Sequence, residues 1–424
     1  MESKTIRSNL GIIILTLIYL VVNIWFLVQH PGSIFNQPER FGEAISLYGS
    51  RDASLYAKMA WQIINDGIYG YNADHSNAYV TPGQPFYLVL IFKLAEVLNT
   101  NHVMLTRLAN MLLNLGIVIL IYKSALMLFN REAISILSSL LYCLHIAPLH
   151  YFRTTLTEIP AIFLFLLSFF LFLLAREHKK YRLHILFGIV ASITLMFRAT
   201  PAPLLLLAWG IILKETGFKE GVKIGFIWCI GPLLIMAPWV IRNVALFNQM
   251  YLFSSHAGDP LLAGTNAFYM KEHAELLLEA NERGLTSEEY GQIRMIDGFK
   301  GNFPLFFSWY TIGKLVWLFM DTSGNPEGLG PYSQEFSNVV LHFFRWQNAL
   351  TVLIAFISII VCRHNRNFIF LSFMIIIYIG ISNIFLTIPR YGFFIYPFIC
   401  IIAAFGLVKG WNIVIFRRLK KESG

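Results

Sequence analysis

The sequence predicts an all-α membrane protein with about ten transmembrane helices and additional juxtamembrane helices. Hydrophobic residues make up 56% of the 424 residues and charged residues only 13%, whereas a soluble domain carries roughly a quarter of charged residues. Uncharged runs such as 10–28 and 368–388 account for the excess, because about 20 apolar residues cross a hydrocarbon core. These observations exclude an ordinary water-soluble domain.

The apolar runs that follow one another along the chain are even in number, which predicts that both termini lie on the same side of the membrane. The predicted spans are residues 10–28, 104–121, 133–147, 159–175, 183–197, 199–213, 222–241, 346–362, 368–388 and 391–408.

Lys and Arg set the predicted orientation, because short loops rich in these residues stay on the cytoplasmic side. With the N-terminus inside, most basic loop residues fall inside, including the cluster at 176–182 and the tail at 417–421. The formal net charge of +9 is then a topology signal and gives no reason to invoke nucleic acid. We therefore expect the cytoplasmic membrane as the location, with both termini in the cytoplasm.

Two further apolar stretches, 86–98 and 308–320, are assigned to the outer surface. The first contains Lys93 and Glu96 and the second contains Lys314, a composition typical of helices that lie along an interface. Counting either stretch as a span would reverse the orientation of every later loop.

The chain is accordingly expected to form a single polytopic domain, residues 1–424, with two long outer loops. The first loop covers 29–103 and includes juxtamembrane helices, and the second covers 243–345. Thr286 and Glu289 have the spacing of a capping box, which predicts a helix start in the second loop. Loops of this length in a compact membrane protein usually carry function.

Asp52 is the first candidate for chemistry, because it opens a predicted helix in the first outer loop. The unpaired amides and the dipole at a helix N-terminus favour a negative charge. A purely structural role, in which Asp52 caps this helix, is the alternative.

Other charged residues stand at the predicted outer ends of spans. Each could anchor its span by extending toward the interface, but their convergence on one face suggests a shared site. These residues are Arg107, Arg153, Glu158, Arg198, Arg242 and Arg390.

The order of these motifs resembles the polytopic glycosyltransferases of the GT-C superfamily, in particular the polyprenyl-phosphate-mannose-dependent mannosyltransferases and the lipid A aminoarabinose transferases. The likeness covers nearly the whole chain. It rests on Asp52-Ala53 with Tyr56 and Ala60, Thr81-Pro82-Gly83 with Pro85, Arg107, Glu158, Arg198 with Pro201, Pro238-Trp239 with Arg242-Asn243, Lys314, and Pro389-Arg390-Tyr391 with Pro397.

The resemblance implies transfer of a sugar from a polyprenyl-phosphate carrier to an acceptor on the extracytoplasmic face, by a single inverting displacement. It gives Asp52 the role of orienting the acceptor hydroxyl and receiving its proton. The departing phosphate needs fixed cations, for which the candidates are Arg390, Arg242, Arg198 and Lys314. Tyr56, Arg107, Glu158 and Tyr391 are expected to support the substrate pocket.

The expected partners are a polyprenyl-phosphate-linked sugar, an acceptor lipid, glycan or protein, and the bilayer. Some relatives use a divalent metal, but no Asp-x-Asp stands near Asp52 and no ligand set is nominated. Two alternatives remain open: a flippase or transporter for lipid-linked sugars, and an oligosaccharide polymerase or ligase that uses diphosphate-linked donors. A transporter more often has ionisable groups near the bilayer midplane and repeated halves.

Overall fold

The structure is a computed structural model that describes residues 2–29, 43–256, 258–320, 337–362 and 365–422. Parts of both predicted outer loops, 30–42 in the first and 257 and 321–336 in the second, lie outside the described residues, as does Arg363–His364 of the loop before the span at 368–388. Every regular element within the described ranges is a helix. The predicted all-α class is confirmed.

Five of these helices are long and apolar enough to cross a membrane. They are α1 (Glu2–Gln29), α6 (His102–Phe129), α9 (Glu158–His178), α20 (Asn338–Val361) and α22 (Pro389–Glu422). Three shorter apolar helices accompany them, namely α7 (Glu132–Cys143), α10 (Tyr181–Phe197) and α21 (Arg366–Ser382). The remaining predicted spans coincide with α11 (Leu204–Thr216) and with a broken run, α12 (Phe218–Trp228), α13 (Ile230–Ile235) and α14 (Ala237–Phe247).

The broken run can form a sixth span, but it is bent by 48° between Ile235 and Ala237. Pro238 lies in the first turn of α14. A proline has no backbone N–H, and its ring clashes with the carbonyl four residues earlier, so a helix ends or kinks just before it. The predicted span at 222–241 is therefore a chain of short helices.

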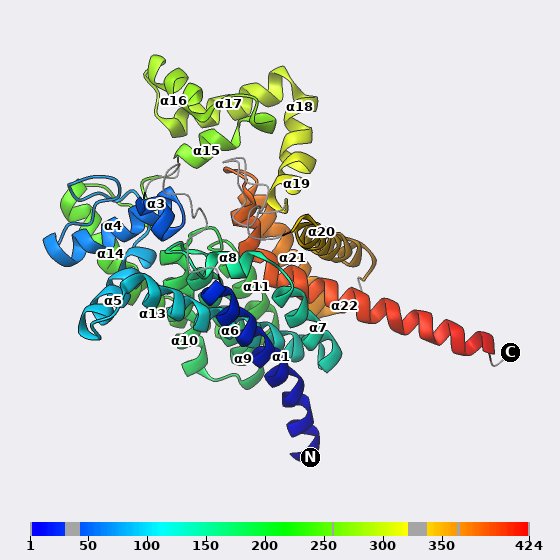
Figure 1. Ribbon diagram of the computed structural model, residues 1–424. Helices are drawn as coiled ribbons and strands as arrows, with labels where there is room; N and C mark the ends of the chain where they lie inside the picture. Colours follow the sequence, from blue (N-terminus) through cyan, green and yellow to red (C-terminus); the bar gives the residue numbers. More distant parts are fainter. Residues whose placement is uncertain (1, 30–42, 257, 321–336, 363–364, 423–424) are drawn as a thin grey trace.

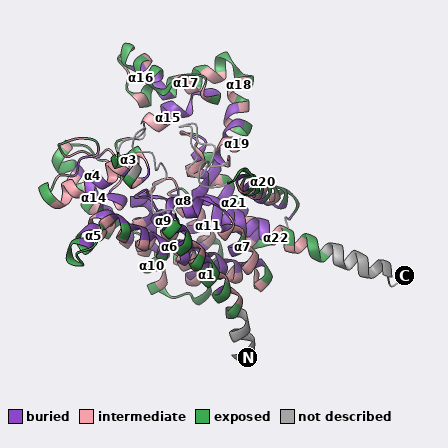
Figure 2. Cartoon of the chain, viewed as in Figure 1, coloured by how far each residue is buried: buried purple, intermediate pink, exposed green. Residues whose placement is uncertain are grey.

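Three helices form the centre of the bundle. In the apolar windows of α6, α9 and α22, 56%, 67% and 72% of the residues are buried, compared with 28% in α1 and 22% in α20. Figure 2 shows the same contrast, with buried residues along the inner helices and exposed ones along α1 and α20. The first half of α22 is packed on all sides, with Phe393 to Ala404 almost fully buried.

Two groups of helices lie outside the bundle, away from the N-terminus (Figure 1). The first group consists of α3 (Glu43–Tyr48), α4 (Arg51–Asp66) and α5 (Gly83–Val97). The second group, here called the α15–α19 unit, consists of α15 (Gly258–Gly264), η1 (Ala267–Tyr269), α16 (His273–Glu282), α17 (Ser287–Gly301), α18 (Phe303–Ser308), η2 (Trp309–Gly313) and α19 (Lys314–Leu318). The short helix α8 (Ala147–Tyr151) follows α7.

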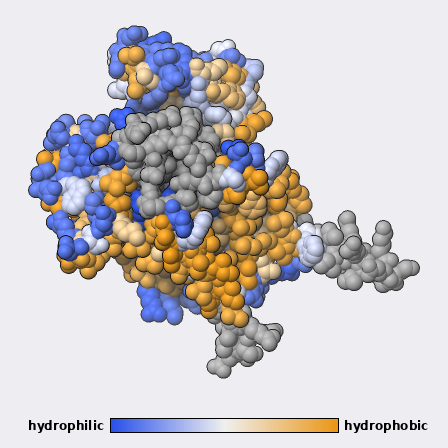
Figure 3. All heavy atoms as spheres, in the orientation of Figure 1, coloured by the Kyte–Doolittle hydropathy of each residue, from blue (hydrophilic) through white to orange (hydrophobic). Residues whose placement is uncertain are grey.

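Hydrophilic residues cover much of both groups, whereas apolar residues cover the visible side of the bundle (Figure 3). The predicted capping box starts α17, where the Thr286 hydroxyl accepts from the Glu289 amide at 3.2 Å and the Glu289 carboxylate accepts from the Thr286 amide at 2.9 Å. The stretches 86–98 and 308–320 fall in α5 and in η2 with α19, and neither is among the helices that can span.

Candidate active site

Asp52 lies in the first turn of α4 and does not cap that helix. Ser50 is the cap, because its hydroxyl accepts a hydrogen bond from the Ala53 amide at 3.1 Å. The Asp52 carboxylate is therefore available for other partners, while the helix N-terminus still favours its negative charge.

Arg390 joins Asp52 to a second carboxylate. Its Nη1 lies 2.8 Å from Asp52 Oδ2, and its Nε donates to Glu158 Oε1. Glu158 also accepts from Nη2 of Arg198, whose guanidinium donates to the Thr157 hydroxyl at 3.1 and 3.2 Å. We call Asp52, Glu158, Arg198 and Arg390 the carboxylate–arginine cluster.

Glu158 and Arg198 stand at helix ends where the dipole favours their charge, whereas Arg390 lies in the first turn of α22, where a cation depends on its carboxylate partners. Pro389 starts α22 because proline is tolerated at the first helical position, and Arg390 follows it. Glu158 is the first residue of α9, where an acidic side chain is favoured, and Arg198 directly follows α10, where a cation is favoured. The cluster thus joins the ends of three apolar helices.

The turn before α5 packs against this end of α10. The Thr81 hydroxyl donates to the Phe197 carbonyl at 3.2 Å, and a Cβ at Gly83 would lie 2.7 Å from the Met196 carbonyl oxygen. Only glycine allows so close an approach. The Thr81-Pro82-Gly83 motif therefore holds the residues directly before Arg198.

The four side chains of the cluster differ in how far they are buried, from Glu158, the most buried, to Asp52, the most exposed. The side chain of Glu158 is 1% exposed, those of Arg198 and Arg390 are 10% and 19% exposed, and that of Asp52 is 49% exposed. A buried charge needs opposite charges beside it, and Glu158 has two guanidiniums. The four formal charges balance. Asp52 has the most exposed side chain of the four and is therefore the member best placed to meet a substrate.

Tyr71 is a site residue that the sequence did not indicate. Its hydroxyl donates to Asp52 Oδ1 at 3.2 Å, and burial, followed by the Asp52 charge, raises the pKa of Tyr71, which keeps the donor protonated. Burial alone would raise the pKa of Asp52, but Arg390, Tyr71 and then His256 outweigh it and hold that pKa below its usual value. Asp52 is therefore ionised at neutral pH.

A column of rings extends from Tyr71 to the α15–α19 unit. Tyr71 lies 5.6 Å from the Tyr56 ring and stacks on Tyr79 at 5.3 Å, and Tyr79 lies 4.0 Å from His256. The Tyr79 hydroxyl donates to Asp259 at 3.2 Å. Tyr56 thus lies beside Tyr71, and its support of a substrate pocket stays a prediction, whereas no local motif marks His256 or Asp259.

Tyr391 lies beside Arg198. The Arg198 guanidinium stands 5.2 Å from the centre of the Tyr391 ring, a distance at which a cation is attracted to an aromatic face. The ring thereby limits where the guanidinium can lie.

The other predicted cations use their donors elsewhere. Arg107 donates to the carbonyl of Arg153 at 3.1 Å and to that of Leu47 at 3.4 Å. Arg242 donates to the Asn77 carbonyl at 3.1 Å and lies over the Tyr69 and Trp239 rings.

Lys314 donates to two backbone carbonyls, at 2.6 Å to Asn383 and at 2.9 Å to Phe385. The structure therefore gathers Arg390 and Arg198 at Asp52 and Glu158, and it places Arg107, Arg242 and Lys314 in separate contacts.

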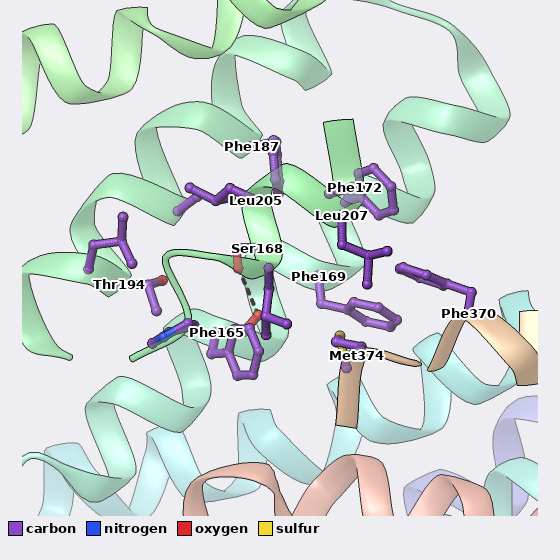
Figure 4. Close-up of a pocket in the computed structure, with 15 residues that line it drawn as sticks. Phe165, Ser168, Phe169, Phe172, Phe187, Thr194, Leu205, Leu207, Phe370 and Met374 are labelled. Carbon is purple, nitrogen blue, oxygen red and sulfur yellow. Dashed lines mark hydrogen bonds between the residues drawn. The ribbon is translucent and has the colours of Figure 1, made fainter. Parts of the chain in front are cut away.

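An apolar cavity of about 50 Å³ lies between α9, α10, α11 and α21 (Figure 4). Phe165 and Phe169 of α9, Leu205 of α11 and Met374 of α21 line it. Phe165 stacks on Phe394 at 4.9 Å, and Phe394 lies 5.8 Å from the Arg198 guanidinium. The cavity is thus two contacts away from the cluster and has room for a few methylene-sized groups.

A metal site has no candidate ligand set among the residues that the structure describes, since no three His, Cys, Asp or Glu side chains there are grouped to hold an ion. Arg390 already occupies the space between the carboxylates of Asp52 and Glu158. In the described part of the chain these two carboxylates are thus paired with a guanidinium and are not arranged around a cation.

No family model and no curated protein matches this sequence. Among solved structures, that of the Archaeoglobus fulgidus oligosaccharyltransferase, tethered by a disulfide bond to an acceptor peptide containing the NVT sequon, is similar over 95% of this chain with a TM-score of 0.52 and 13% sequence identity. The similarity covers 50% of that protein, so this chain spans about half its length. At this identity the likeness shows the fold alone, so this all-α chain, with five helices among its described residues long and apolar enough to span a membrane, shares the helical architecture of that structure.

Proposed function

We propose that this protein is a glycosyltransferase that moves a sugar from a polyprenyl-phosphate carrier to an acceptor by an inverting displacement. The observation that carries the proposal is the contact between Asp52 and Arg390 at the exposed end of a buried charge cluster, with an apolar cavity two ring contacts away from Arg198. A carboxylate for the acceptor, cations for the phosphate and apolar space for the lipid are the three parts that this reaction needs.

The donor phosphate would bind Arg390 and Arg198. A guanidinium can contact two phosphate oxygens at once, and these two stand at the ends of apolar helices where a lipid headgroup lies. Once Asp52 turns toward the acceptor, Arg390, Arg198 and Glu158 together carry a net charge of +1. That charge matches a sugar monophosphate ester of a polyprenol, a phosphodiester with one negative charge, better than it matches a diphosphate.

The lipid chain would begin at the apolar cavity lined by Phe165, which is connected to Arg198 through Phe394. The cavity accommodates a few methylene groups, so the remainder of the chain would lie along the apolar surface of the bundle. We do not include Arg242 and Lys314 among these ligands, because Nη1 of Arg242 and the Lys314 ammonium bond backbone carbonyls; their part in phosphate binding stays a prediction from the sequence.

Asp52 would orient the acceptor hydroxyl and take its proton. The acceptor oxygen forms a bond to the anomeric carbon while the bond from that carbon to the phosphate oxygen breaks, and the polyprenyl phosphate leaves with the electron pair. Because Arg390 and Tyr71 hold the pKa of Asp52 low, this carboxylate is a weak base, and its main contribution is orientation.

The proposed location of the site is the extracytoplasmic face. Glu158 begins α9, and Arg176 and His178 stand in its last turn, followed by the basic loop up to Arg182. Basic loops of this kind stay in the cytoplasm, so the Glu158 end of the same helix would face the other side.

The fold comparison favours a second candidate, in which the donor is a lipid-linked oligosaccharide and the acceptor a peptide. The similar solved structure is an oligosaccharyltransferase with a bound acceptor peptide.

Transfer assays with reconstituted protein test the proposal. One arm supplies a polyprenyl-monophosphate sugar and a parallel arm a diphosphate-linked glycan, each with cell-envelope lipids, glycans and peptides as acceptors. We expect release of polyprenyl phosphate and an inverted glycosidic product in the first arm. Transfer only in the second arm would favour the second candidate, and movement of lipid-linked sugar across vesicles without transfer would identify a flippase.

A further inference from the structure

Residues of the α15–α19 unit contact the segment that precedes Arg390, although the two parts are far apart in the sequence. Residues 383–388 connect α21 to α22 and end directly before Pro389. Lys314, in α19, donates to the carbonyl of Asn383 at 2.6 Å and to that of Phe385 at 2.9 Å. One ammonium group thus fixes two carbonyls on the approach to Arg390.

The α15–α19 unit forms further contacts with residues 383–388. The Leu386 amide donates to the Pro260 carbonyl at 2.7 Å, and the Tyr269 hydroxyl donates to the Thr387 carbonyl. A Cβ at Gly264 would lie 2.6 Å from the Phe385 carbonyl carbon, so the backbones approach each other as closely as glycine permits.

Lys314 occupies an unusual place for a lysine. Its side chain is fully buried, with the ammonium 4.1 Å from the Tyr310 ring centre and 5.6 Å from that of Trp309, and it forms no ion pair with an acidic group in the part of the chain that the structure describes. Burying an unpaired cation is costly. Burial lowers the pKa of Lys314 to about 7, and a neutral amine still has two N–H donors for the two carbonyls.

The same unit also reaches the Asp52 side of the site. Asp259, the residue before Pro260, accepts from the Tyr79 hydroxyl at 3.2 Å, and Tyr79 stacks on Tyr71, which donates to Asp52. Of two successive residues of α15, Pro260 therefore contacts the segment that leads to Arg390, and Asp259 contacts Tyr79, which reaches Asp52 through Tyr71.

We propose that Lys314 is a positioning residue, which holds residues 383–388 so that Arg390 reaches Asp52 and Glu158. It acts through Arg390 and does not itself bind the donor phosphate. The kinetic part of this inference rests on the proposed function, whereas the coupling between Lys314 and Arg390 is a property of the fold that can be measured without substrate.

A double-mutant cycle separates positioning from direct binding. The four proteins are wild type, Lys314→Met, Arg390→Lys and the double variant, assayed for sugar transfer and for thermal unfolding in detergent. We expect Lys314→Met to lower kcat/KM for the donor at least about tenfold in the wild-type background and less than about twofold in the Arg390→Lys background, because residues that act through one another are not additive. The unfolding temperatures should show the same non-additivity.

Lys300→Met is the matched control, since Lys300 is an exposed lysine of α17 in the same unit. It should leave transfer and unfolding unchanged. If Lys314→Met does not fold, Tyr269→Phe replaces it, because that change removes only the bond to the Thr387 carbonyl.

The outcomes are distinct. Equal effects of Lys314→Met in both Arg390 backgrounds, in transfer and in unfolding, would overturn the positioning role. Absence of sugar transfer by the wild type from any donor would instead refute the proposed function, and the unfolding cycle would still decide the role of Lys314.

Discussion

The guanidinium of Arg390 lies 2.8 Å from the carboxylate of Asp52, although 338 residues separate them in the sequence. Each of these groups has a second use in the proposed reaction, Arg390 for the donor phosphate and Asp52 for the acceptor hydroxyl. The two uses compete with the ion pair, so the pair must open when the donor binds. Donor binding would then release Asp52 toward the acceptor.

The first prediction concerns Asp52→Asn. The variant should lose transfer by at least about 100-fold, as expected for removal of a catalytic carboxylate, yet bind a polyprenyl phosphate more tightly than wild type, because Arg390 no longer has a competing anion. Titration of detergent-solubilised protein with farnesyl phosphate measures the affinity.

Asp66→Asn is the control for this experiment, since Asp66 is an exposed carboxylate at the far end of the same helix, α4. Its affinity for farnesyl phosphate should equal that of wild type. Weaker binding by Asp52→Asn would show that Asp52 helps to hold the donor and would contradict the competition.

The second prediction concerns Glu158→Gln, which leaves Arg198 and Arg390 facing each other without the buried carboxylate between them. Removal of one partner from a buried charge cluster typically costs about 3–5 kcal/mol. We expect a clear fall in the unfolding temperature, measured by intrinsic fluorescence in detergent. The conservative change Glu177→Gln at the far end of α9, next to the exposed Arg176–Glu215 contact, should leave it unchanged, and an equal stability of both variants would refute a structural role of the Glu158 charge.

The third prediction is a pH dependence set by Asp52. Arg390, Tyr71 and His256 hold its folded-state pKa below the usual value of about 3.9. The stabilisation from this shift is complete above that value and is lost as the pH falls through the lower, folded-state pKa. Between pH 5 and 7, transfer should therefore show no acid limb from Asp52.

Tyr71→Phe removes one of the hydrogen bonds that lower this pKa. The acid limb of the pH–rate profile should move to higher pH in this variant, with the folded protein otherwise intact. An unchanged limb would mean that another group controls it.

The fourth prediction concerns the pH dependence of stability at Lys314. Its pKa is about 7 in the folded protein and roughly 10.4 in an unfolded chain, so the unfolded state binds more protons between these values and stability rises with pH across them. The slope approaches about 1.4 kcal/mol per pH unit for one proton. Lys314→Met should remove this increase, which unfolding temperatures between pH 7 and 9.5 would reveal, and an identical slope in both proteins would contradict the burial of a titrating amine.

The sequence was sufficient for the long helices, because they leave a local signal. Long uncharged runs mark α1, α6, α9, α20 and α22, and charged residues at the ends of apolar runs made Glu158, Arg198 and Arg390 candidates together with Arg107, Arg153 and Arg242. Which charged side chains come into contact, however, depends on how α9, α10 and α22 pack together, and the pattern of apolar residues along the sequence does not contain this information.

The sequence was insufficient wherever a partner is a backbone atom or a lone aromatic ring. Arg107, Arg242 and Lys314 look like Arg390 in composition, but their donors bond carbonyls that only the folded chain brings near. Tyr71 had no motif around it, and its importance follows only from its distance to Asp52. The roles of all these residues in catalysis remain predictions.

The cluster is attached to the membrane through the helices that carry it. Glu158 begins α9, Arg390 is the second residue of α22, and Arg198 directly follows α10, so a tilt of any of these helices moves a charged group relative to its partners. A helix tilts when the hydrocarbon thickness around it changes. The acyl-chain length of the surrounding lipids therefore acts on the spacing of the charges themselves, and the composition of the bilayer becomes part of the geometry of the site.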